Sequence, residues 1–200
     1  MISGINMQTI DLRAETGELV VAGAAQFEEM LRQLLNEIVA AVTGDEEIAF
    51  IGIRSRGNHL AERLAAGFTE RTGRRVDVGA LDIGFYRDDF ATAGFRQPKI
   101  NDSKIDFSID GKTVFLVDDV LYTGRTVRAA LICFADLGRT RCIKLVELID
   151  RGLREMPIQA DFLAMRLITL PSQWVRVRVK EKDGEDMAIV SPSRASGKRK

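Results

Sequence analysis

The segment Val114 to Thr126 (VFLVDDVLYTGRT) most constrains the fold, because a buried strand, two carboxylates and a glycine-containing turn follow one another without a gap. Val114 to Val117 is a short apolar run, typical of a strand covered on both faces of a parallel sheet. A helix is predicted from Thr126 to a stop at Gly138, since apolar residues recur at helical spacing. Its predicted buried face is Val127, Ala130, Leu131, Phe134 and Leu137. A strand, a turn and a helix in this order place a ligand at the carboxyl end of the strand.

The turn and the carboxylates predict a phosphorylated sugar as the ligand. The backbone N–H groups from Thr123 to Thr126 lie at a helix N-terminus, where an anion is favoured, and Gly124 allows close approach. Asp118 and Asp119 cannot hold the phosphate because like charges repel, so we expect them to face a sugar diol or a hydrated Mg²⁺, which makes any metal contact indirect. The Walker A and GxGxxG patterns are absent. The alternative is that these aspartates are solvated loop residues beside an ordinary helix cap.

The remaining pattern predicts an α/β fold with a central, mostly parallel sheet flanked by helices. Helices are predicted from Phe27 to a stop at Gly44 and from Asn58 to Thr72. Further strands are predicted at Ile48–Ile53, Val76–Ile83, Cys142–Ile149, Ala160–Leu167 and Trp174–Lys180. We expect one domain over residues 26–182. A flexible arm (1–25), with room for a strand near Leu19–Val21, would precede it, and a basic flexible tail (191–200) would follow.

Two segments leave alternatives open. Gly84 to Asp110 is long, polar and without periodicity, so it is either a lid that excludes water from a reactive site or a disordered surface insertion. Trp174 to Lys180 alternates valines with three cations. That stripe is either an RNA-facing surface or the solvated face of an antiparallel edge strand, and we prefer the edge strand.

Composition excludes several classes of function. Lys plus Arg equals Asp plus Glu at 29 each, so no overall basic field indicates nucleic acid or membrane as partner. No apolar run approaches the roughly 20 residues of a membrane span, and the N-terminus lacks the basic start of a signal peptide. We therefore expect a cytoplasmic protein without a membrane partner. Cys133 and Cys142 have no CxxC spacing or nearby histidine, so both are predicted to be buried free thiols.

The segment Val114–Ala129 closely resembles the phosphoribosyl-pyrophosphate (PRPP) motif of type I phosphoribosyltransferases. Three other segments resemble one branch of them, the bifunctional pyrimidine operon regulators with uracil phosphoribosyltransferase activity: IGIRSRG (Ile51–Gly57), GALDIGFYRDD (Gly79–Asp89) and DRGLREMPI (Asp150–Ile158). The resemblance implies the type I phosphoribosyltransferase fold with a flap loop and a small hood. It also implies the reaction of uracil with PRPP to give UMP and pyrophosphate, with Mg²⁺ as the cofactor that accompanies PRPP.

The resemblance also implies a role for each matching residue. Asp118 and Asp119 would hold the ribose hydroxyls, and Thr123, Gly124, Arg125 and Thr126 would hold the 5′-phosphate, with Val120, Leu121 and Tyr122 completing the PRPP segment. Ser55, Arg56 and Gly57 would contact pyrophosphate. The flap would begin with Tyr86, Arg87, Asp88 and Asp89, and Arg87 would act with the two aspartates in catalysis. Uracil would lie against Asp150, Arg151 and Gly152. Purine-specific relatives typically carry an Asp where this chain has Tyr122, which fits a pyrimidine enzyme.

The second function of the branch, binding of pyr leader mRNA in response to uridine nucleotides, is where the sequence departs from the pattern. RNA-binding relatives typically carry Thr-Arg-Ile-Ala-His-Glu on the first helix, and this chain has Gln33 and Asn36 at the Arg and His positions. Leu153 replaces a usual His, and Met165 replaces a usual Lys. Candidate RNA contacts that stay are Arg32, Arg54 and Arg166. We therefore rank the enzyme first and the RNA regulator second, and the resemblance implies a homo-oligomer. A PRPP sensor without catalysis ranks third.

Overall fold

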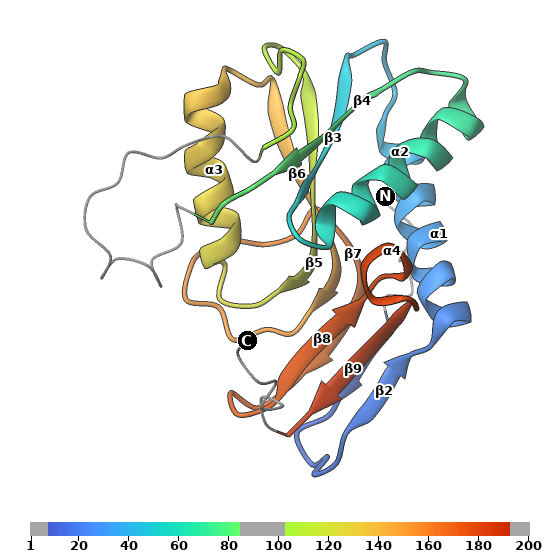
Figure 1. Ribbon diagram of the computed structural model, residues 1–200, viewed down its shortest axis with the longest axis vertical. Coiled ribbons are helices and arrows are strands. Elements are labelled where there is room, and N and C mark those ends of the chain that lie inside the picture. The colour runs from blue at the N-terminus through green and yellow to red at the C-terminus, as the bar shows by residue number, and fades with distance from the viewer. Residues whose placement is uncertain (1–7, 85–102, 193–200) are drawn as a thin grey trace.

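The computed structural model describes residues 8–84 and 103–192, which form two sheets and their helices (Figure 1). The larger sheet has six strands, all parallel, in the order β1-β7-β6-β5-β3-β4. Its strands are β1 (Gln8–Asp11), β3 (Ile48–Ile53), β4 (Asp77–Leu81), β5 (Thr113–Leu121), β6 (Cys142–Asp150) and β7 (Phe162–Ile168). Helix α1 (Ala24–Ala41) and helix α2 (Gly57–Thr72) cover one face, and α3 (Arg125–Leu137) covers the other. This is the α/β architecture that the sequence predicts.

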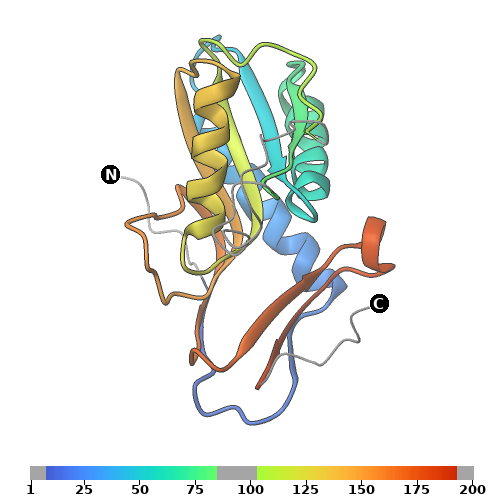
Figure 2. The same ribbon diagram turned by 60° about the vertical axis from the view of Figure 1, so that its left-hand side comes forward.

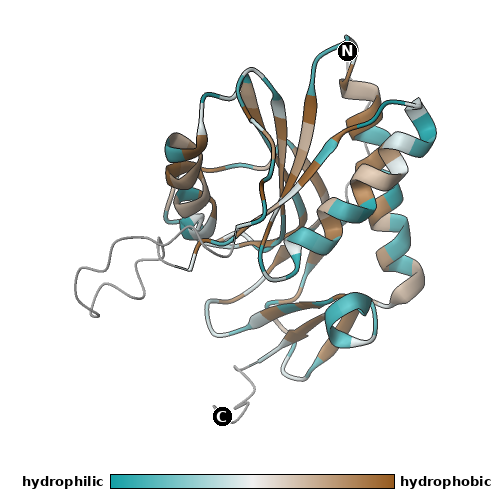
Figure 3. Cartoon of the chain, turned by 45° about the horizontal axis from the view of Figure 1, so that its top comes forward, coloured by the Kyte–Doolittle hydropathy of each residue, from teal (hydrophilic) through white to brown (hydrophobic). Residues whose placement is uncertain are grey.

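Strand β5 lies near the centre of this sheet and is buried on both faces. Phe115 and Val117 belong to the apolar cluster under α1 and α2, where the rings of Phe50 and Phe115 stack with their centroids 5.0 Å apart. Val114 and Leu116 belong to the cluster under α3. Figure 3 shows the apolar colour concentrated on the strands and on the inner faces of the helices. The prediction of a doubly covered strand before the two aspartates is therefore confirmed.

A second, antiparallel sheet forms a small hood beside the carboxyl ends of the parallel strands (Figure 2). The hood consists of β2 (Leu19–Ala22), β8 (Trp174–Arg178), the short helix α4 (Lys180–Asp183) and β9 (Met187–Ser191). It is joined to α2 by ion pairs, because Arg63 binds both Glu181 and Asp186 at 2.7 and 2.9 Å. The hood therefore has a fixed position relative to the segment that follows β3.

The edge-strand interpretation of the cationic stripe is confirmed. Strand β8 lies at the edge of the hood sheet and pairs with β9 alone. Arg176 pairs with Glu18 at 2.8 Å, and Arg178 pairs with Glu185 at 2.5 Å, while Val177 is buried. Arg176 and Arg178 are thus on a solvated face and are partly neutralised by their neighbours, whereas Lys180, the third cation of the predicted strand, begins α4.

Several predictions need correction. The segment expected to be a flexible arm contributes β1 to the large sheet and β2 to the hood, and Ser191, assigned to the tail, ends β9. Leu131 is 41% exposed because the buried stripe of α3 lies on the side of Ala129 and Cys133, rotated away from it. Cys133 is a buried free thiol as expected, but Cys142 is only half-buried. Within the described residues, no helix is long and apolar enough to cross a membrane.

Candidate functional site

The acidic pair lies near the end of β5, immediately after the doubly buried run. Asp118 is 7% exposed, and its Oδ1 accepts a hydrogen bond from the backbone N–H of Asp119 at 2.9 Å. Burial raises the pKa of Asp119, while the positive charge of Arg56 opposes that rise. The strand continues beyond the pair to Leu121, so the backbone of both aspartates belongs to the sheet and not to a loop. A rigid acidic pair of this kind suits recognition of a fixed diol.

The segment after β3 approaches the acidic pair through two glycines. A Cβ on Gly57 would lie 2.4 Å from the carbonyl oxygen of Val117, and a Cβ on Gly52 would lie 2.2 Å from the carbonyl oxygen of Gly57. Both contacts are with backbone, so neither position has room for a side chain. Because Gly57 begins α2, this close approach brings the helix N-terminus and the preceding Ser55 and Arg56 to the tip of β5.

Arg56 connects this segment to the hood. Its Nε and one terminal nitrogen each bind a carboxylate oxygen of Asp183 at 2.9 Å. The hydrogen bond to Asp183 raises the pKa of Arg56, and the nearby charge of Asp119 contributes in the same direction. The guanidinium is therefore a cation held between the hood and the acidic pair.

The predicted phosphate cradle is a tight turn between β5 and α3. Gly124 adopts φ +90°, in the left-handed region that favours glycine, and a Cβ there would lie 3.0 Å from Cβ of Met156. Helix α3 begins at Arg125, one residue earlier than predicted, so its first unpaired N–H groups lie at the turn. Amides at a helix start, next to a glycine, form a ready anion site.

The predicted base-binding segment is fastened to the cradle. The N–H of Arg151 donates to the carbonyl oxygen of Leu121 at 3.1 Å, and the N–H groups of Glu155 and Met156 both donate to Thr123 at 3.0 Å. The guanidinium of Arg151 lies 4.2 Å from the centre of the Tyr122 ring. Asp150, Arg151 and Gly152 therefore lie beside the turn between β5 and α3.

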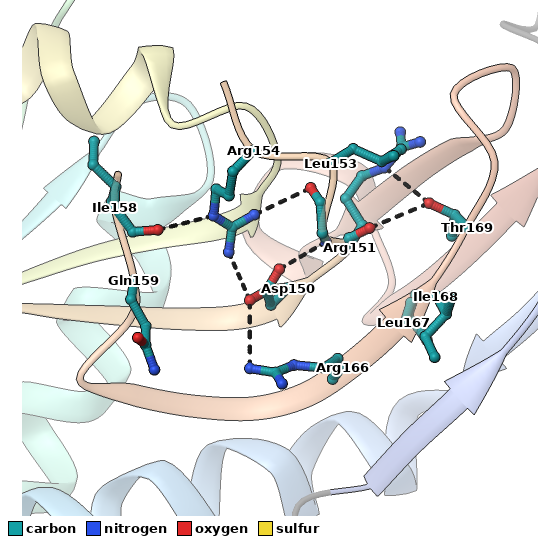
Figure 4. A pocket seen from close by; sticks show the side chains of 11 residues that line it. Asp150, Arg151, Leu153, Arg154, Ile158, Gln159, Arg166, Leu167, Ile168 and Thr169 are labelled. Atoms are coloured by element: carbon teal, nitrogen blue, oxygen red, sulfur yellow. Dashed lines mark hydrogen bonds and ion pairs between the residues drawn. The ribbon is translucent and has the colours of Figure 1, made fainter. Parts of the chain in front are cut away.

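Arg154, which the sequence analysis did not single out, holds these two segments together (Figure 4). One of its nitrogens pairs with the carboxylate of Asp150 at 2.6 Å. The others donate to the carbonyl oxygens of Leu121, Tyr122, Gly152 and Ile158. Beside it lies a pocket of about 470 Å³, where Arg166 approaches Asp150 at 3.8 Å. The signal in the sequence was the Arg of DRGLREMPI. Its role becomes visible only in the folded structure.

Replacing Arg154 with lysine is expected to lower the free energy of unfolding by about 2–4 kcal/mol, because a single ammonium cannot reach four carbonyl oxygens and a carboxylate at once. Denaturant unfolding of the purified variant measures the change. Arg166→Lys is the matched control: Arg166 is 43% exposed and makes one long contact with the same carboxylate. We expect that control to stay within about 0.5 kcal/mol of the wild type. Equal losses in both variants would contradict the role given to Arg154.

Some predicted site residues lie elsewhere. Tyr86, Arg87, Asp88 and Asp89 fall outside the described residues. Arg32 is on α1, where it pairs with Glu29 at 2.5 Å. Over residues 8–84 and 103–192, no group of three or more His, Cys, Asp or Glu side chains could hold a metal ion.

The comparisons with known proteins agree with this geometry. The model of the phosphoribosyl transferase domain matches residues 22–183. The chain therefore belongs to the phosphoribosyl transferase family.

Curated relatives place it within that family. It is 48% identical over 163 residues to the Bifunctional protein PyrR of Thermus thermophilus, covering 82% of this chain and 90% of that protein. It is 46% identical over 173 residues to the Bifunctional protein PyrR of Chloroflexus aurantiacus, covering 86% and 94%. This level of identity puts the chain in the PyrR branch. Among solved structures, the hypoxanthine phosphoribosyltransferase of Trypanosoma cruzi matches with a TM-score of 0.63 at 14% identity, over 88% of this chain and 97% of that one, which shows the shared fold.

Proposed function

We propose that this protein is a uracil phosphoribosyltransferase that transfers ribose 5-phosphate from PRPP to uracil, giving UMP and pyrophosphate. The observation that carries the proposal is the junction at the tip of β5, where the acidic pair, the glycine turn at the start of α3 and the Asp150–Gly152 segment meet. Membership of the PyrR branch supports the same reading. We assign the activity to one domain that extends beyond the predicted residues 26–182, because β1, β2 and β9 lie outside those bounds.

The chemistry that we propose is displacement at the anomeric carbon through a state with positive charge on the sugar. Asp118 and Asp119 bind the ribose hydroxyls and lie near that developing charge, while the cradle from Thr123 to Thr126 fixes the 5′-phosphate. We propose that Arg56, together with Arg87, which lies outside the described residues, neutralises the leaving pyrophosphate. Mg²⁺, bound to the pyrophosphate of PRPP, supplies further neutralisation of that charge when present. We propose no covalent nucleophile.

We propose that uracil is recognised by the segment from Asp150 to Gly152 beside Tyr122. The guanidinium of Arg151 is already engaged, since it donates to Thr169 Oγ1 at 3.2 Å and to the carbonyl oxygen of Leu170 at 3.0 Å. The backbone N–H groups of Arg151 and Gly152 are engaged as well, so this segment would offer the base the second lone pair of its carbonyl oxygens. At the position where purine-specific relatives typically carry an Asp, this chain has Tyr122, whose ring packs against Arg151. The position therefore supplies no carboxylate to bind a purine nitrogen.

Incubation with PRPP, Mg²⁺ and each nucleobase in turn tests activity and base choice together. We expect UMP from uracil and no mononucleotide from adenine, guanine or hypoxanthine. Formation of a purine nucleotide would refute the base assignment, and the absence of any product together with unconsumed PRPP would refute the enzyme.

A second candidate function is regulation by binding RNA, which the name Bifunctional protein PyrR of the relatives favours. Arg32 and Arg166 keep 56% and 43% of their side chains exposed and could contact phosphates. A gel shift with structured pyr leader RNA, with and without uridine nucleotides, tests this function, and no shift at low salt would remove it. We also propose a cytoplasmic homo-oligomer, for which the exposed Leu131 and Ile132 on α3 offer an apolar surface.

A further inference from the structure

Glu147 is an acid inside an otherwise apolar stretch of β6. It lies within β6, between Val146 and Leu148, and its side chain is 0% exposed. Neither of its carboxyl oxygens has a hydrogen-bond partner among the residues that the structure describes. Burying a carboxyl group without a hydrogen-bond partner destabilises a fold, because the group loses its hydration without compensation. A role at the neighbouring site would explain why such a group is present.

The position of Glu147 in the sheet brings it to the acidic pair. In the parallel register between β5 and β6, Glu147 stands opposite Asp118. Side chains opposite one another in adjacent strands leave the sheet on the same face, about 5 Å apart. Leu116 and Leu145, each two residues earlier on its strand, belong to the same apolar cluster under α3. Glu147 and Asp118 therefore lie side by side on the α3 face.

Burial and the neighbouring negative charges favour the neutral form of Glu147. Burial is the main cause that raises its pKa well above the ordinary value, and the negative charges of Asp118, Asp119 and Asp150 add to the rise. Arg154 is the positive group that opposes it, and that guanidinium is already shared between Asp150 and four carbonyl oxygens. A neutral carboxylic acid carries a hydroxyl hydrogen, so Glu147 is a donor beside an acceptor.

The two aspartates then have different supports. Asp119 is influenced by the positive charge of Arg56, on the α2 side of the sheet. The carboxylate of Asp118 also lies within hydrogen-bonding reach of Asp119, and its neighbour across the ladder is Glu147. Adjacent carboxylates repel each other, and a hydrogen bond from an acid to a carboxylate is among the stronger neutral-to-ion contacts.

We propose that Glu147 is a positioning residue for the proposed reaction: when the ribose hydroxyls bind, its buried acid donates to Asp118 and fixes that carboxylate in the orientation that grips them. The inference rests on the proposed function, since it concerns the sugar site of that enzyme. It assigns to Glu147 a part in binding the sugar and none in binding uracil.

The test compares Glu147→Leu with Glu147→Gln. Leucine removes the donor and the buried polar group together, so we expect the KM for PRPP to rise about tenfold while the melting temperature rises. Glutamine keeps a donor at the same length, so its KM for PRPP should stay within about threefold of the wild type. The KM for uracil should not change in either variant. A merely structural role for Glu147 would not raise the melting temperature and weaken PRPP binding in the same variant.

Leu145→Ala is the matched control, because it opens space on the same face of β6 without touching the acid. It should lower the melting temperature and leave the KM for PRPP unchanged. The inference would be overturned by a Glu147→Leu variant with a wild-type KM for PRPP, or by one that melts at a lower temperature or fails to fold. It would also be overturned if Glu147→Gln were as impaired as Glu147→Leu. A raised KM in Leu145→Ala would do the same. Wild-type turnover is measured first, since its absence would remove the proposed function itself.

Discussion

Replacing Asp118 and Asp119 together with asparagine is expected to lower turnover of uracil with PRPP by about 10³-fold or more, because each aspartate supplies charge and fixed geometry at the sugar. The fold should survive. Both residues follow the doubly buried run of β5, and asparagine matches aspartate in size. Initial rates with saturating uracil, together with a circular dichroism spectrum, measure the two effects separately.

Asp110→Asn is the control for this pair. Asp110 precedes β5 at the opposite end of the strand, where its Oδ2 accepts a hydrogen bond from Ser108 at 3.1 Å. It should keep wild-type turnover. Turnover that persists in the double variant with an unchanged spectrum would remove the aspartates from the mechanism.

Gly57→Ala is expected to have the second largest effect, with the free energy of unfolding reduced by about 3 kcal/mol. The added Cβ would meet the carbonyl oxygen of Val117 at 2.4 Å and Cα of Asp118 at 3.1 Å, so either α2 or β5 must move. Movement of either displaces Arg56 or the acidic pair. We therefore expect the KM for PRPP to rise together with a melting temperature lower by about 10 °C.

Gly67→Ala on the same helix is the matched substitution. The three atoms nearest to its Cβ would all belong to the side chain of Leu35, with Cδ2, at the end of that side chain, nearest at 2.5 Å. Alanine is also the better helix former, so the variant should remain within about 1 kcal/mol of the wild type with an unchanged KM. If both glycine variants behaved alike, the close approach of α2 to β5 would not be what positions the site.

The sequence was sufficient to predict the central elements of the fold because their signals are local. Ile48–Ile53 is a strand with the predicted bounds, and α2 ends at Thr72 as predicted. The candidate site residues on β5 and in its following turn lie together because strand, turn and helix are adjacent in the chain.

What the sequence did not show depends on contacts between distant segments. Strand β1 has only four residues and becomes a strand by pairing with β7. Arg154 is one arginine among many until the fold brings five acceptors around it. Glu147 has a local signal, an acid inside an apolar run, but its meaning comes from the register that sets it opposite Asp118.

A crystal structure with bound ribose 5-phosphate tests the central claim most directly. The account predicts the phosphate within hydrogen-bonding distance of the amides from Thr123 to Thr126, and the ribose hydroxyls on Asp118 and Asp119. A ligand that left this turn empty and bound instead in the pocket beside Arg154 and Arg166 would contradict it.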